Sequence, residues 1–256
     1  MTEETPSYEP ELLTEETDEE ARPKLGPWQR IVRVFWAPAE VFEDIRRRPT
    51  WVLPLLGIML LSLATQMVAV QHIDLRTTLM ERMESRNTEI SEEQLDRAVE
   101  VAEKMKYLGP VAGLLIVPVA MAALAGIFLV SIRTTGGETD FRTTFSSMLH
   151  AYWPPSFTGS VLGMVLFSRA GALPQDELQR VVKSNLGAFL SADAPRWQHA
   201  LAGSVDIFNL WTIALLVMGF SIVARISRGR AAVAVLVPWG AYILVKVGLA
   251  MIFGGM

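Results

Sequence analysis

Few residues of this 256-residue chain could perform chemistry, and they do not fall into catalytic spacings. The chain has no Cys, which excludes disulfides, thiolate zinc sites and cysteine nucleophiles. The motifs GxxxxGK, GxGxxG, HExxH and GxSxG are all absent. The three His residues, His72, His150 and His199, are far apart in the sequence, and an interfacial hydrogen bond explains each of them. The sequence therefore predicts no enzyme activity, no metal and no cofactor.

Three polar residues in apolar surroundings are candidates for a site inside a membrane: Asp206, Asn209 and Lys246. A charge at membrane depth is costly, so Lys246 is a functional candidate. If the last two apolar segments run antiparallel, Asp206 falls within one helical turn of Lys246, whose long stem could reach that carboxylate. A structural pair and a solute or proton pathway are both consistent with this pattern.

A segment rich in aromatic and basic residues precedes the first apolar run. Pro38 suits the first turn of a helix that has Val41, Phe42 and Ile45 on one side and arginines at its end. Such a helix could lie in the headgroup plane on anionic lipid, or pack on a helix bundle. The membrane-surface candidates are Trp28, Arg30, Arg33, Phe35, Trp36, Phe42, Arg46, Arg47 and Arg48.

The elements that must position these residues are apolar helices. Apolar residues form 51% of the chain and charged residues 20%, and the mean hydropathy is +0.31. A bilayer core about 30 Å thick needs roughly 20 apolar helical residues. The run from Ala112 to Val130 lacks the polar stripe of a soluble helix. We therefore predict an all-α polytopic membrane protein, a bundle of five spans near 51–70, 109–131, 148–168, 204–224 and 231–252.

Small residues recur at a spacing of four within two of these spans, as Gly109 with Gly113 and Gly159 with Gly163. Such pairs let helix backbones approach closely in lipid, where water does not drive association. We expect packing within the bundle, and a homo-oligomer is the alternative.

The charge pattern predicts the orientation. The connection between the last two spans carries Arg225, Arg228 and Arg230, and short basic loops favour the cytoplasm. The protein is therefore expected in the cell (inner) membrane, with its amino terminus in the cytoplasm and its carboxyl terminus on the outer side. Nine of the 27 acidic residues lie in the first 20 positions. Residues 1–27 are therefore predicted to be a disordered acidic cytoplasmic tail, and residues 28–253 the membrane domain.

The outer loops are expected to be helical. Leu75, Leu79 and Met83 recur at helical spacing, and Ser91 with Gln94 forms a capping-box pattern before a second helix. In the second loop, Pro174 could open a helix that continues to Phe189. Pro195 could open a short helix that leads into the fourth span.

Three stretches resemble the Yip domain family, the Ypt- and Rab-interacting membrane proteins with five spans, and in particular its bacterial branch. They are APAEVFEDIRRRPTWVLPL from Ala37 to Leu55, AYWPP from Ala151 to Pro155, and DIFNLWTIALLVMGFSIVARISRGRAA from Asp206 to Ala232. The resemblance implies a cytosolic amino terminus. In eukaryotic members it further implies binding of small GTPases and a role in vesicle traffic or membrane shaping.

The leading functional hypothesis is a non-enzymatic integral membrane protein that organises membrane or recruits partners. Its partners would be the lipid bilayer and possible proteins or further copies of itself. The small net charge of −4 gives no indication of a nucleic-acid partner. The alternative is a small permease or transporter subunit that uses the polar residues of the spans. A membrane-embedded hydrolase ranks third, because no polar pair recurs at catalytic spacing.

Overall fold

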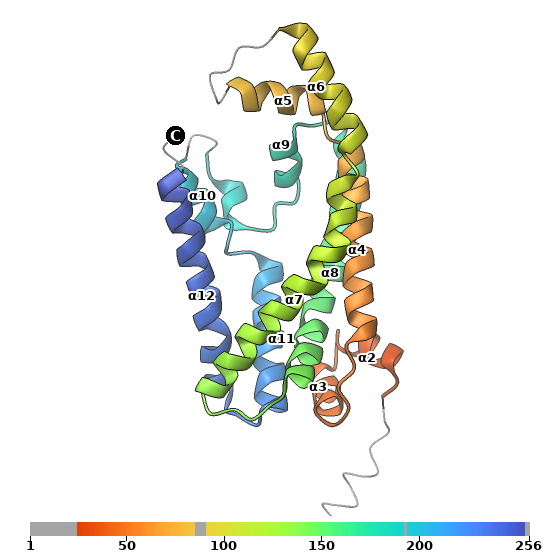
Figure 1. Ribbon diagram of the computed structural model, residues 1–256. Coiled ribbons are helices and arrows are strands. Elements are labelled where there is room, and N and C mark those ends of the chain that lie inside the picture. The colour runs from red at the N-terminus through yellow and green to blue at the C-terminus, as the bar shows by residue number, and fades with distance from the viewer. Residues whose placement is uncertain (1–24, 85–90, 192–193, 254–256) are drawn as a thin grey trace, which may run out of the picture.

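The computed structural model describes residues 25–84, 91–191 and 194–253, and these residues are mainly helical (Figure 1). The described part contains no extended strand, only two isolated β-bridges. Five long helices form the bundle: α4 (Val52–Gln71), α7 (Leu108–Thr134), α8 (Phe141–Ala170), α11 (Ile207–Val223) and α12 (Arg228–Phe253). The expected all-α membrane-type bundle is confirmed.

Three of these helices, α4, α7 and α12, are long and apolar enough to cross a membrane. Helix α11 is apolar but has only 17 residues, and α8 has 30 residues with polar first turns. The five predicted apolar segments thus all lie in long helices, while length and composition support a span for three. Five spans remain our proposal.

Helix α8 begins at Phe141, earlier than the predicted boundary at 148. Asp140 caps this helix: its carboxylate accepts the Thr143 backbone N–H at 2.9 Å and the Thr143 hydroxyl at 2.8 Å. Burial alone would raise the pKa of Asp140, but these hydrogen bonds outweigh it and lower the pKa below its usual value. The polar first turns of α8 are buried in the bundle, so an apolar-run criterion places the start of this helix too late.

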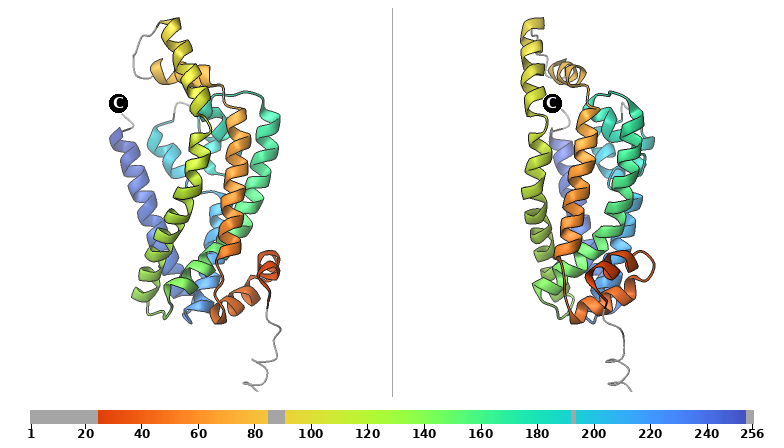
Figure 2. Two further views of the ribbon diagram at one scale, coloured as in Figure 1. Left: turned by 45° about the vertical axis from the view of Figure 1, so that its right-hand side comes forward. Right: turned by 90° about the vertical axis from the view of Figure 1, so that its right-hand side faces the viewer.

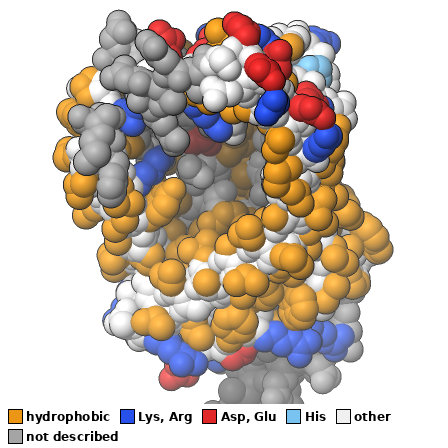
Figure 3. Space-filling view, turned by 45° about the horizontal axis from the view of Figure 1, so that its top comes forward, with side chains coloured by type: hydrophobic (Ala, Val, Ile, Leu, Met, Phe, Trp, Pro, Cys, Tyr) orange, Lys and Arg blue, Asp and Glu red, His pale blue; other side chains and the backbone are white. Residues whose placement is uncertain are grey.

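Large apolar side chains cover the outside of the bundle. Figure 3 shows them as a band between charged side chains at the two ends of the molecule. The exposed residues include Leu115, Ile116 and Val119 of α7, and Leu244 and Val245 of α12. Contiguous apolar surface of this kind indicates contact with lipid.

We call the end that carries α2 (Pro27–Arg33) and α3 (Pro38–Arg47) the basic end (Figure 2). The α7–α8 and α11–α12 connections lie there as well (Figure 1). Much of the apolar core is close to this end, where α3 packs on α8 and α11. Its fully buried side chains include Val41, Phe42, Ile45, Met148, Leu149 and Phe220.

The opposite end, which we call the loop end, is built from short helices, as expected. They are α5 (Leu75–Glu84), α6 (Glu92–Met105), α9 (Gln175–Arg180), the 3-10 helix η1 (Leu186–Phe189) and α10 (Arg196–Ala202). The predicted capping box of α6 is confirmed, since Ser91 and Gln94 exchange hydrogen bonds of 3.1 and 3.3 Å. The helix expected from Pro174 to Phe189 is wrong in extent, because α9 ends at Arg180 and the chain turns before η1.

Ion pairs join the first two of these short helices. The guanidinium of Arg76 on α5 lies 2.5 Å from both Glu92 and Asp96 of α6. The hydrogen bond with Asp96 and the nearby negative charges raise the pKa of Arg76. The two helices predicted between the first two apolar segments therefore pack on each other and are joined by ion pairs at the surface.

Backbone hydrogen bonds join the chain after α4 to the chain after α8. The N–H of Asp74 donates to Leu173 O at 2.8 Å, and the N–H of Leu173 donates to His72 O at 2.9 Å. The backbone N–H of Gln175 adds a 3.1 Å hydrogen bond to the Thr78 hydroxyl. We call this set of contacts the loop clasp. The backbone N–H and hydroxyl of Thr77 also hydrogen-bond Asp74 and lower its pKa.

Candidate functional site

The segment before α4 folds into two short helices whose starts follow from local sequence. Each has a Pro in its first turn, Pro27 in α2 and Pro38 in α3, where a missing N–H costs no hydrogen bond. The N–H of Gly26 donates to the Gln29 side chain at 2.8 Å, which closes the start of α2. The predicted helix from Pro38 is therefore present, preceded by a second one.

Arg30 is the buried centre of this segment. Its side chain is 3% exposed and pairs with Asp44, which is 15% exposed, at a distance of 2.7 Å. The same guanidinium donates to Arg48 O at 2.8 Å and to the Thr50 hydroxyl at 2.5 Å. Because several of its donors have partners, the charge can lie out of water. Arg30 thereby joins α2 to α3 and to the chain that enters α4.

The apolar side of α3 is buried against the bundle. Val41, Phe42 and Ile45 are fully buried, and α3 packs mainly on α11. The ring of Phe42 lies directly over Gly219, where an added Cβ would approach it to 2.9 Å. Of the two placements considered for this helix, the structure therefore has the one in which it packs on the bundle.

Helix α8 holds the same segment from the other side. The indole N–H of Trp153 donates to Ile31 O at 3.1 Å, and the Ser146 hydroxyl donates to Thr50 O at 2.7 Å. Phe35 meets Phe157 and Trp211 edge-on, with ring centroids 5.9 and 6.4 Å apart. The segment is thus fixed to α8 by hydrogen bonds and to α8 and α11 by ring contacts.

Most of the remaining large and basic side chains of the segment are exposed. Trp28 is 70% and Trp36 66% exposed, and Val32 is half exposed. Arg33 pairs with Glu40 at 2.9 Å on the surface, and Arg46 pairs with Glu43 at 3.0 Å. We call the exposed side chains the Trp–Arg set: Trp28, Val32, Arg33, Trp36, Arg47 and Arg48. Of the nine membrane-surface candidates, Arg30 and Phe42 are buried, Phe35 and Arg46 are partly buried, and the other five are exposed.

The three polar candidates of the spans lie at the loop-end portions of α11 and α12, and each makes different contacts. Asp206 caps α11, where it accepts the N–H groups of Phe208 and Asn209 at 2.8 and 3.2 Å and the hydroxyl of Ser184. The ammonium of Lys246 donates to the Ser204 hydroxyl at 3.2 Å. Among the described residues no ion pair joins Lys246 to Asp206. Asn209 lines a cavity between the helices.

The glycines that set the closest helix contacts are not the predicted pairs. A Cβ on Gly109 would meet nothing within 4 Å, and one on Gly159 would meet Phe208 at an ordinary 3.7 Å. A Cβ on Gly113 would approach Gln66 to 3.4 Å, and one on Gly163 would approach Phe167 to 3.5 Å.

Within the long helices the tight positions are Gly57 and Gly219. A Cβ on Gly57 would approach the Trp153 ring to 2.4 Å, and one on Gly219 would approach the Ser147 hydroxyl to 2.7 Å. These single glycines have no partner at a spacing of four. The spacing of small residues therefore does not reveal them, and nothing in the sequence indicates that they lie against aromatic rings.

Within the described residues, no group of three His, Asp or Glu side chains is arranged to hold a metal ion. The basic end presents exposed aromatic rings and guanidinium groups, and the side chains that support them are buried and hydrogen-bonded.

Comparison with known proteins identifies a family. The model of the Yip1 domain matches residues 32–250, which includes α3, four of the five long helices and most of α12. No significant match was found among curated proteins or solved structures. The matched region covers most of the chain and agrees with the helical membrane-type bundle, so the chain belongs to the Yip1 domain family.

Proposed function

We propose that this protein is a non-enzymatic membrane organiser whose basic end engages the anionic cytoplasmic leaflet and recruits protein partners there. The observation that carries the proposal is the Trp–Arg set on a rigid base. Trp28 and Trp36 are exposed, while Arg30 and Phe42 of the same segment are buried.

The chemistry of the set suits a lipid headgroup layer. Tryptophan favours the interface, where its ring lies in an apolar region and its N–H in a polar one. Arginine binds phosphate oxygens with two parallel hydrogen bonds and attracts anionic lipid. Because Arg30 and Trp153 already fix the backbone of α2, little ordering entropy is lost when the surface binds.

The charge distribution supports a cytoplasmic basic end. Residues 25–50, 133–142 and 224–230 hold ten arginines and five acidic residues. The described residues of 72–107 and 169–206 hold nine basic and eleven acidic residues. By the positive-inside rule the basic end is cytoplasmic. Together with five spans, this orientation places the amino terminus inside the cell and the carboxyl terminus outside.

The test uses the full chain in nanodiscs of phosphatidylcholine alone or mixed with phosphatidylglycerol, with brominated acyl chains as quenchers. The signal of Trp28 and Trp36 is the difference in emission between the native chain and the Trp28→Phe/Trp36→Phe variant. We expect stronger quenching of this difference signal in brominated phosphatidylglycerol than in brominated phosphatidylcholine. An Arg33→Gln/Arg47→Gln/Arg48→Gln variant should lose the preference.

The control is Trp239, a partly exposed residue in α12 away from the α2–α3 segment. The same difference measurement with Trp239→Phe should show no preference for the anionic lipid. Equal quenching of Trp28 and Trp36 in the two lipids would contradict the proposed lipid engagement.

A second candidate function, a small permease or transporter subunit, is favoured by one observation: Asn209 lines a cavity between the helices. It ranks second because Asp206 caps α11 and Lys246 binds Ser204, which are structural tasks. A Lys246→Met variant that assembles normally but loses uptake of a solute would move this candidate to first place.

A further inference from the structure

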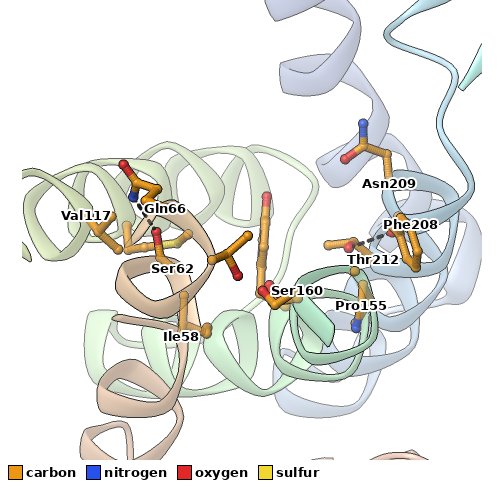
Figure 4. Close-up of a pocket in the computed structure, with 14 residues that line it drawn as sticks. Ile58, Ser62, Gln66, Val117, Pro155, Ser160, Phe208, Asn209 and Thr212 are labelled. Atoms are coloured by element: carbon orange, nitrogen blue, oxygen red, sulfur yellow. Dashed lines mark hydrogen bonds between the residues drawn. The ribbon is translucent and has the colours of Figure 1, made fainter. Parts of the chain in front are cut away.

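A cavity of about 470 Å³ lies between α4, α7, α8 and α11. This volume is within the range of about 300–1,000 Å³ typical of small-molecule sites. Figure 4 shows Ser62 and Gln66 of α4 on one side, Asn209 and Thr212 of α11 on the other, and Ser160 of α8 between them. Its lining residues are Ile58, Ser62, Thr65, Gln66, Val117, Met121, Tyr152, Pro155, Ser156, Gly159, Ser160, Phe208, Asn209 and Thr212.

The position of the cavity along the helices places it within the apolar band. Ser62 is near the middle of α4 (Val52–Gln71), and Met121 is at the middle of α7 (Leu108–Thr134). Both helices are apolar and long enough to cross a membrane. In a bilayer, the middle of both helices lies at the depth of the acyl chains, and the part of the cavity that they line lies there with them.

The polar groups around the cavity carry no formal charge at neutral pH. Eight of the lining residues have a hydroxyl or an amide, and none is Asp, Glu, Lys, Arg or His. A phosphate or carboxylate at this depth would lack a countercharge and would pay a large desolvation cost. The lining therefore favours a ligand that forms hydrogen bonds but is uncharged.

Half of these polar groups have hydrogen bonds within their own helix. Thr65 donates to Leu61 O, Thr212 donates to Phe208 O, and Gln66 donates to the hydroxyl of Ser62.

The side chains of Tyr152, Ser156, Ser160 and Asn209 have no hydrogen-bond partner among the described residues. They supply both donors and acceptors. Hydroxyl and amide groups at membrane depth are stabilised when a polar partner reaches them. These four are therefore the groups that a bound molecule would satisfy.

The apolar part of the lining fits the remainder of such a molecule. Ile58, Val117, Met121 and Phe208 supply aliphatic, thioether and aromatic surface next to the polar groups. The outside of the neighbouring helices is also apolar: Val161 and Leu162 of α8 and Leu210 of α11 are exposed. An acyl chain that leaves the cavity would therefore contact apolar side chains.

We propose that this cavity binds the polar head of an uncharged lipid with a free hydroxyl and ester groups, the diacylglycerol class. The hydroxyl and ester oxygens bind Ser156, Ser160 and Asn209, and the start of the acyl chains lies against Ile58 and Met121. This inference goes beyond the function proposed for the basic end and does not depend on it.

The test uses the full chain in phosphatidylcholine nanodiscs that contain a photoactivatable diacylglycerol, with its diazirine near the carbonyl end of one acyl chain. After illumination, intact mass spectrometry measures labelling and peptide mapping locates it. We expect labels on α4, α7 or α8 beside the cavity. Ser160→Leu, which removes a hydroxyl and puts an apolar side chain into the cavity, should reduce labelling about tenfold when the probe is below saturation, as an affinity loss of one decade would.

A second variant protects against a folding defect in Ser160→Leu. Asn209→Ala removes an exposed side chain that has no protein partner, so it should leave the melting temperature unchanged while labelling falls. The matched control is Ser168→Leu, an exposed position on the same helix, where labelling should stay at the native level.

Two further probes separate the lipid from other ligands. A phosphatidic acid with the same chains and diazirine tests an anionic head, and free glycerol tests a soluble polyol as a competitor. Weak labelling by the phosphatidic acid and no effect of glycerol would support the proposal. It would be overturned by equal labelling with both lipids, by competition from glycerol, or by native labelling of both cavity variants.

Discussion

At the scale of single residues, Arg30 shows how a basic side chain next to a membrane can be structural. In the sequence it lies among aromatic residues as Arg33 does, so the pattern predicts both at the membrane surface. The structure separates them, because Arg30 pairs with Asp44 in the interior and Arg33 pairs with Glu40 in solvent. The partners Asp44 and Thr50 are 14 and 20 residues away, and only the folded chain brings them together.

We predict that Arg30→Met destabilises the bundle strongly. It leaves the Asp44 carboxylate largely buried without its countercharge, and breaking such a pair costs about 3–5 kcal/mol. Thermal unfolding of the detergent-solubilised chain would show this as a marked fall in midpoint.

Arg33→Met is the matched control, because this exposed ion pair should contribute only about 0–1 kcal/mol. Similar midpoints for the two variants would show that the buried network around Arg30 does not hold the segment.

The hydrophobic pattern predicts which apolar side chains of α3 are buried, but it does not predict the positions of the arginines. Val41, Phe42 and Ile45 were expected on one face, and all three are fully buried. Their burial follows from helical spacing alone, whereas the surface that covers them could not be deduced because lipid and a helix bundle bury the same apolar face.

At the scale of helices, close packing depends on single glycines under bulky side chains. We predict that Gly219→Ala, on α11, destabilises the protein by about 1–3 kcal/mol through overpacking. The reason is that its Cβ would lie 2.7 Å from Ser147 Oγ and 2.9 Å from the Phe42 ring. Thermal unfolding in detergent again provides the measurement.

Gly126→Ala on α7 is the comparison, since its added Cβ would meet nothing within 4 Å. There the higher helix propensity of Ala should be neutral or stabilise by about 0.5–1 kcal/mol. A Gly219→Ala variant as stable as Gly126→Ala would mean that α3 and α8 shift away from α11 without cost.

Helix positions were largely predictable from the sequence, and the exceptions have physical causes. Apolar runs lie inside α4, α7, α11 and α12, because lipid requires uninterrupted apolar helix. The start of α8 was missed because its buried Thr and Ser side chains resemble a loop when only hydropathy is read.

The predicted helix after Pro174 was too long, because η1 and the chain after it are held by distant contacts. The N–H of Leu186 donates to Val205 O at 3.1 Å, and the N–H of Ile207 donates to Ser184 O at 3.1 Å. Backbone groups paired in this way are withdrawn from a continuous helix. Contacts across some twenty residues are invisible to a periodicity argument.

At the scale of the whole molecule, the orientation of the bundle can be tested directly. We predict that a reporter active only outside the cytoplasm functions when fused after Met256, whereas a fluorescent reporter that needs the cytoplasm stays dark there. The reason is the excess of arginine at the basic end, which the positive-inside rule assigns to the cytoplasm.

Fusions at the amino terminus serve as the control and should behave in the opposite way. A fluorescent carboxyl-terminal fusion would mean an even number of spans, and α8 or α11 would then be the helix to remove from the proposed five.

The family and the bundle were within reach of sequence reasoning, whereas the cavity was not. Its polar residues come from three helices and stand far apart along the chain: Ser62, Ser160 and Asn209 share no motif. A cavity forms where packed helices leave space unfilled, and a single sequence gives no direct information about that packing.

The loop clasp constrains how a lipid could reach the cavity. Backbone hydrogen bonds join the chain after α4 to the chain after α8 through His72, Asp74 and Leu173, and the two helices also pack on each other and form one wall of the cavity. Entry by separating them at that end would require breaking the clasp. We therefore expect a lipid to enter from the bilayer beside α7 or α11, the two other helices that line the cavity.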